Sequence, residues 1–234
     1  DPLEWNVTDR NLAMACSVSY SDIYSRHIGK YLSELEKSYK DEINGRFNET
    51  ANMSEMEDWK VTGKASSMHG LQVIALKKGN KIIIAYRGTE PGDSDDKMEK
   101  DIDWSNNILT YLKGESYQAP EAKIFIKEVM KKNKECKFYI TGHSLGGHLA
   151  YSGGAAGIEY DNDSINKIVT FNGLGLALKR KNKSDESTFD VLCLNAGKIT
   201  NYSVKGDPVS QGLLQATTTH VGTTVLYEKS SKSP

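Results

Sequence analysis

Hydrophobic residues recur at helical spacing in the first part of the chain, over about residues 8–42. Within this stretch, TDRNLAMACSVSYSDIYSRHIGKYLSELEKSY, apolar side chains return every three or four positions. The pattern predicts an N-terminal segment of one or two helices, with Thr8 or Asp9 as the cap and His27 on a helix face. The residues from about 44 to 57 are polar and have no clear period, so we expect a loop there.

From residue 71 onward the pattern changes to the short runs that are typical of β-strands. LQVIALKKGNKIIIAYRG predicts a hairpin, and the run from Ile82 to Ile84 is typical of a strand buried on both faces. Strands alternating with helices indicate an α/β fold with a mostly parallel sheet covered on both faces. We expect a single domain over 1–234 with a flexible tail at about 229–234. The further predicted helices are near 104–112, at 119–133 and after Ser144, and the strands are at 136–142, 165–173, 198–204 and after His220.

Composition excludes several classes of function. Hydrophobic residues make up 38% and charged residues 26%, and the formal net charge is −1, so we expect no nucleic-acid partner. The three cysteines are far apart and show no metal-ligand spacing, and we expect neither metal nor cofactor. No apolar run approaches the ~18 residues of a transmembrane helix. Because the first residue is not methionine and the last residues are typical of a linker, we expect this domain to be part of a longer protein.

The segment TGHSLGGHLA places Ser144 between glycines in a Gly-x-Ser-x-Gly pattern. That pattern indicates a nucleophile when it follows a strand and opens a helix, since the turn between them lifts the serine oxygen above the sheet. Both flanking elements are predicted here. The helix also carries Gly146, Gly147, Gly153 and Gly154, each of which costs about 1 kcal/mol relative to alanine in a helix interior. We interpret them as sites where backbone approaches backbone beneath the turn.

A nucleophilic serine needs a base and an acid that orients the base. His220 lies in a loop after the last long strand and is the predicted base, whereas His143 should face away from the serine and His148 should be structural. Asp207 follows the strand at 198–204 and is the predicted acid. Asp185 and Asp190, the alternatives, lie in what we expect to be a polar loop. The order Ser144, Asp207, His220 is that of the α/β-hydrolase fold.

The negative oxygen that forms during acyl transfer needs hydrogen-bond donors. The backbone N–H of Leu145, directly after the nucleophile, is one predicted donor. Thr89, which follows the buried strand in IIIAYRGTE, is the other.

These motifs together resemble the class 3 lipase family and its bacterial lipase-like relatives. The likeness rests on YRGTE, DWSNN, TGHSLGGHLA, VTFNGLG, GDPVS and HVGTTVLYE, and covers about residues 70–228. It implies an α/β-hydrolase fold with the same triad and with Thr89 in the oxyanion hole. Two departures stand out: Asn107 replaces the aspartate usual in that segment, and residues 91–100, where relatives carry a lid, are very polar.

We therefore predict a serine carboxylic-ester hydrolase of lipase or phospholipase A type, acting on acyl lipids through an acyl-enzyme. Leu213 and Leu214 are candidate walls of the acyl pocket. The expected partners are a phospholipid or acylglycerol substrate, a transient membrane-surface contact and, for a secreted bacterial effector, a protein partner. Two alternatives stay open: a thioesterase or acyltransferase with the same triad, and a non-catalytic module that binds a partner on a hydrolase scaffold.

Overall fold

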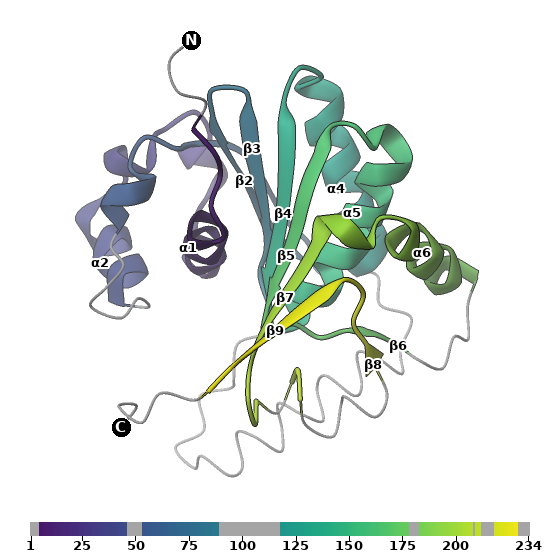
Figure 1. The fold of residues 1–234 in the computed structure, drawn as a ribbon. Helices are drawn as coiled ribbons and strands as arrows, with labels where there is room; N and C mark the ends of the chain where they lie inside the picture. The colour runs from purple at the N-terminus through teal and green to yellow at the C-terminus, as the bar shows by residue number, and fades with distance from the viewer. Residues whose placement is uncertain are drawn as a thin grey trace.

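Within the residues that the computed structural model describes, which are 5–45, 53–88, 118–177, 183–207, 209–211 and 218–228, seven strands form one sheet (Figure 1). The strand order is β1-β2-β3-β4-β5-β7-β9. The pairs β1–β2 and β2–β3 are antiparallel, and each pair from β3 to β9 is parallel, as the sequence predicts. The strands are β1 Lys60–Ser66, β2 Gln72–Lys78, β3 Lys81–Tyr86, β4 Lys137–His143, β5 Ile165–Phe171, β7 Ile199–Val204 and β9 Thr223–Tyr227, with β6 Leu176–Ala177 paired to β8 Thr218–Thr219.

Helices cover both faces of the sheet (Figure 1). On one side lie α1 and α2, and on the other α4, α5 and α6. None of the described helices is long and apolar enough to cross a membrane. The helices are α1 Asp9–Tyr20, α2 Lys37–Gly45, α4 Gln118–Lys132, α5 Leu145–Asp161 and α6 Lys183–Leu194, with 3₁₀ turns η1 Ser25–His27, η2 Leu32–Glu34, η3 Met53–Met56 and η4 Ala196–Lys198.

The strand β3 separates two hydrophobic cores. Ile82, Ile84 and Tyr86 belong to the core beneath α4 and α5, whereas Ile83 and Ala85 belong to the core beneath α1. Because successive side chains of a strand point to opposite faces, an unbroken apolar run is what burial on both faces requires. The predicted double burial of this strand is therefore confirmed.

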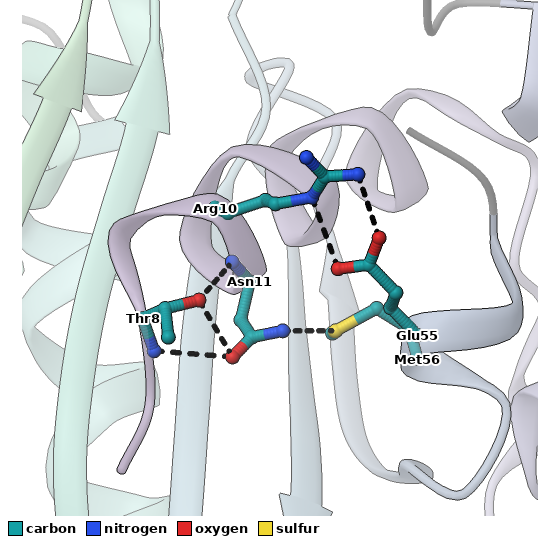
Figure 2. A network of polar contacts seen from close by, with 5 residues as sticks. All are labelled: Thr8, Arg10, Asn11, Glu55 and Met56. Carbon is teal, nitrogen blue, oxygen red and sulfur yellow. Dashed lines mark hydrogen bonds and ion pairs between the residues drawn. The ribbon is translucent and has the colours of Figure 1, made fainter. Parts of the chain in front are cut away.

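The N-terminal segment is less continuous than its periodicity predicts. Thr8 caps the N-terminus of α1. Its hydroxyl accepts a hydrogen bond from the N–H of Asn11 (3.2 Å), and Asn11 Oδ1 accepts one from the N–H of Thr8 (3.1 Å). Arg10 forms two hydrogen bonds to Glu55, which joins α1 to η3 (Figure 2). The helix ends at Tyr20, and two 3₁₀ turns precede α2, so the segment contains the two predicted helices separated by short turns.

Two elements differ from the sequence predictions. The strand β1 was not expected, because only one of its seven residues, Val61, is buried, so its sequence carries almost no apolar pattern. The segment around Asp185 and Asp190, predicted as a loop, belongs to α6. Its buried residues Thr188 and Leu192 are four positions apart, which places them on one helix face. The predicted helix near 104–112, the 91–100 segment and the 229–234 tail lie outside the described residues, and the single-domain boundary stays a prediction.

The first turn of α5 packs directly on the backbone of β3 and β4. A Cβ atom added to Gly146 would lie 2.2 Å from the carbonyl oxygen of Tyr86, and one added to Gly142 would lie 2.0 Å from the carbonyl oxygen of Gly146. Atoms cannot approach that closely, so any larger residue forces the backbone apart. The approach of backbone to backbone expected from the glycines of this helix is confirmed at Gly146 and Gly147, whereas Gly153 and Gly154 face the side chains of Tyr86 and Ile168.

The Gly146→Ala substitution is expected to lower the free energy of unfolding by about 2–3 kcal/mol, because the new methyl group meets immovable backbone. Urea denaturation followed by circular dichroism measures the change. The matched control is Gly197→Ala, since a Cβ atom at Gly197 meets nothing within 4 Å. If both variants unfold at the same urea concentration, α5 does not pack on β3 as described.

Candidate active site

Ser144 occupies the turn between β4 and α5. Its backbone has φ 57° and ψ −128°, a positive φ that residues with a side chain rarely adopt. Such a conformation costs about 1–3 kcal/mol and persists only where the surroundings impose it. Here the Ser144 N–H donates to the carbonyl of Phe171 (3.3 Å), and the Ser144 carbonyl accepts from the N–H groups of Gly147 and Leu174 (both 2.9 Å).

The hydroxyl of Ser144 has no fixed role in the fold. It is buried, with the residue 1% exposed, and Oγ has no hydrogen-bond partner in the described part of the chain. A buried hydroxyl without a partner is unfavourable for stability, and such groups are concentrated at functional sites. The serine is therefore held by its backbone while its oxygen stays available.

The N-terminus of α5 supplies a favourable field for negative charge beside this oxygen. Leu145 is the first residue of a helix of 17 residues. The first N–H groups of a helix have no acceptor within the helix, and the helix dipole places partial positive charge there. The N–H of Leu145 is thus suited to the oxyanion role predicted for it.

Asp207 lies three residues beyond the carboxyl end of β7, on the same edge of the sheet as Ser144. Its Oδ1 atom accepts hydrogen bonds from the N–H of Val209 (3.0 Å) and from the N–H and hydroxyl of Ser210 (2.8 and 3.0 Å). Its Oδ2 atom makes no hydrogen bond to a described residue. Burial lowers the pKa of His143, and the negative charge of the nearby Asp207 carboxylate opposes that shift. Asp207 is therefore near the serine turn, with one oxygen available.

His220 lies between two short strands near the level of the serine turn. It directly follows β8, which pairs with β6 beyond the carboxyl end of β5, and it precedes β9, which begins opposite Thr200 of β7. Through Val169 of β5, Thr200 is level with Thr141 of β4, three residues before Ser144. No hydrogen bond joins His220 to Ser144 or Asp207 among the described residues.

Instead, His220 belongs to a buried polar network beneath the site. Its Nδ1 atom lies 3.1 Å from the hydroxyl of Tyr151, which donates its own proton to Asn201 Oδ1 (2.5 Å). The same oxygen accepts from the Thr170 hydroxyl (2.8 Å), and Asn201 Nδ2 donates to the carbonyl of Val221 (2.8 Å). These contacts tie His220 to Tyr151, and its role as the base stays a prediction.

The other histidines lie where a structural role is expected. His148 Nδ1 is 3.1 Å from the carbonyl of Gly175, and His69 pairs with Glu121 (2.8 Å). His143 Nδ1 is 2.9 Å from the hydroxyl of Tyr20, on the α1 side of the sheet. Thr89, Leu213, Leu214 and Asn107, together with the 91–100 segment, lie outside the described residues.

Comparison with known proteins gives the chain its family. The family model for the Tle-like phospholipase domain, described as phospholipase-like, matches residues 23–229. The chain belongs to this family. A sequence comparison with curated proteins finds no significant match.

Solved lipase structures share the fold of this phospholipase-like domain. The Lip2 lipase of Yarrowia lipolytica has a TM-score of 0.59 at 13% identity, over 93% of this chain and 76% of that one. A fungal lipase has a TM-score of 0.56 at 15% identity, over 96% of this chain and 80% of that one. A mutant of MDLA from Penicillium cyclopium has a TM-score of 0.55 at 16% identity, over 97% of this chain and 84% of that one. The α/β-hydrolase fold and the lipase-like resemblance are confirmed, and family and fold together indicate a carboxylic-ester hydrolase.

Sequence reasoning missed the residues that support the site from other elements. Tyr20 contacts the serine turn from α1, while Tyr151 and Asn201 form the network under it. Tyr151 is seven positions after Ser144, two helical turns, which is a weak signal for a shared helix face. Tyr20 and Asn201 carry no local signal, because their partners are remote in sequence.

The stability of the phospholipase-like domain should depend on the charge of His220. Burial lowers the pKa of His220 below its ordinary 6.5, so the unfolded chain binds the proton at higher pH and acidification favours unfolding. We expect the free energy of unfolding to fall as the pH drops below about 6.5, and to fall less in His220→Asn. Asparagine keeps a donor near Tyr151 but cannot titrate. Urea denaturation between about pH 7.5 and about pH 5 tests this, and equal slopes in the two proteins would contradict it.

Proposed function

We propose that this domain hydrolyses carboxylic esters of acyl lipids with Ser144 as nucleophile, His220 as base and Asp207 as the acid that orients the base. The observation that carries the proposal is the Ser144 turn, where a non-glycine residue is held at φ 57° at the N-terminus of a long helix and its hydroxyl has no hydrogen-bond partner among the described residues. No structural requirement explains that combination, whereas a nucleophile requires each part of it.

The reaction follows from the groups around the serine. Oγ attacks the acyl carbonyl and loses its proton to a base, and the carbonyl oxygen becomes negative. The N–H of Leu145 stabilises this charge, with Thr89 as the second proposed donor. The alcohol part of the lipid leaves with a proton, and water then hydrolyses the acyl-enzyme to release a fatty acid.

Two interpretations of His220 are open, and the activity of the His220→Asn variant distinguishes them. Sequence order proposes His220, and its neutral state suits a proton acceptor because burial lowers its pKa. The hydroxyl of Tyr151 lies beside Nδ1 of His220, and no hydrogen bond joins His220 to Asp207 among the described residues, so a supporting role in the fold is the alternative.

The family directs the choice of substrate toward phospholipids, with acylglycerols as the alternative. A net charge of −1 gives no general attraction to an anionic surface, so contact with a membrane is proposed to be transient. Secretion, the role of a bacterial effector and a protein partner stay predictions from the sequence.

The Ser144→Ala variant is expected to abolish hydrolysis while keeping its folding, because alanine retains the backbone turn and loses only the nucleophilic oxygen. Mass spectrometry of the products from mixed phospholipids measures activity. A fluorophosphonate should label the wild-type protein at Ser144 and leave the variant unlabelled. Equal labelling of both proteins would contradict the assignment. Repeating the assay with a metal chelator tests the expected metal independence.

The Asp207→Asn variant is expected to lower kcat by about 10³–10⁴-fold, since it removes the negative charge that stabilises a protonated base. His220→Asn, assayed beside it, should retain most of its activity if His220 only supports the fold. A loss as large as that of Asp207→Asn would instead identify His220 as the base. Near wild-type activity of Asp207→Asn would show that another carboxylate is the acid.

A further inference from the structure

The hydroxyl of Tyr20 lies against the turn that follows β3, beside the nucleophile. It accepts a hydrogen bond from the backbone N–H of Gly88 (3.2 Å) and lies 2.9 Å from Nδ1 of His143. These two partners come from different strands, since Gly88 follows β3 and His143 ends β4. Tyr20 therefore joins the end of α1 to the ends of two neighbouring strands.

The ring of Tyr20 is held in place independently of its hydroxyl. It meets the ring of His143 edge-on, with centroids 5.7 Å apart and planes at 66°, and the guanidinium of Arg87 lies 5.5 Å from its centroid. Aromatic and cation–π contacts of this kind orient a ring. Removing only the hydroxyl should thus leave the ring where it is.

The Gly88 backbone leaves no room for a side chain beside the nucleophile. A Cβ atom added to Gly88 would lie 3.0 Å from Cβ of Ser144, 2.5 Å from the carbonyl oxygen of His143 and 2.6 Å from the hydroxyl of Tyr20. The turn is consequently packed between Tyr20 on one side and the serine on the other. Any shift of Gly88 changes the position of its neighbours in the chain relative to Ser144.

We infer that the Tyr20 hydroxyl is a positioning residue for acyl transfer: it holds the turn after β3 at a fixed distance from Ser144. The inference rests on the proposed function, because the backbone after β3 leads into the proposed oxyanion donor, Thr89. Donors in an oxyanion hole act only when they are fixed before the charge develops. Tyr20 fixes this turn from α1, an element that carries no proposed catalytic residue.

The test is Tyr20→Phe in the full-length protein, assayed on phospholipid and on a p-nitrophenyl ester. Loss of a whole oxyanion donor lowers kcat about 10²–10³-fold, so loosening the turn that carries one should lower kcat about tenfold. KM should stay within about twofold, because the transition state depends on this turn more than the bound substrate does. Expressing kcat per fluorophosphonate-labelled serine removes any contribution from unfolded protein.

The matched control is Tyr24→Phe. Tyr24 lies in the same N-terminal segment, is 44% exposed, and its hydroxyl makes no hydrogen bond to a described residue. Its kcat and KM should equal those of the wild type. If the wild type is active and Tyr20→Phe has the same kcat per labelled serine, the inference is overturned. If the wild type is inactive and unlabelled, the proposed function is overturned instead.

A second measurement does not depend on the variant folding. Amide hydrogen exchange of wild-type Gly88 should be slow, since its N–H is bonded to the Tyr20 hydroxyl. In a folded Tyr20→Phe protein the same amide should exchange at least about tenfold faster, because the hydrogen bond that slows its exchange in the wild type is absent. Unprotected exchange of Gly88 in the wild type would show that Tyr20 does not hold the turn.

Discussion

The approach of α5 to the backbone of β3 and β4 is the constraint on which the active-site architecture depends. Gly146 lies where a side chain would collide with the Tyr86 carbonyl, and Gly142 lies where one would collide with Gly146. This contact brings the helix N-terminus down onto the sheet. Ser144, the residue between them, has to turn within one position, and its positive φ is the result.

That turn connects the chemistry of the site to the topology of the sheet. In a parallel sheet the carboxyl ends of the strands meet at one edge, so the ends of β3, β4 and β7 bring Gly88, Ser144 and Asp207 together. The helix α5 adds its positive end at the same place. Tyr20 reaches the edge from α1, on the other face, and joins the turns after β3 and at β4. Both helical layers thus contribute to a site that the sheet positions.

The buried network around Tyr151, Asn201 and His220 lies under this edge rather than at it. Asn201 pairs with Thr170 in the sheet register, and Thr170 pairs with Gly142, two residues before the serine. The hydroxyl of Tyr151, the side-chain amide of Asn201 and Nδ1 of His220 all have partners, which is the condition under which buried polar groups stabilise a fold. The network therefore supports the strands that carry the site, and the role of His220 as the base stays a prediction.

The sequence by itself determined the elements whose signal is local. The Ile82–Ile84 run predicted a strand with two buried faces, and the glycines around Ser144 predicted a tight strand–helix turn; both depend on neighbours within a few positions. Tertiary structure alone decided the contact of His220 with Tyr151, 69 positions away. It also decided the contact of Tyr20 with Gly88, 68 positions away. Hydrophobic periodicity records which face of an element is buried, but pairing between distant strands depends on packing across the whole sheet, and no short stretch of sequence contains it.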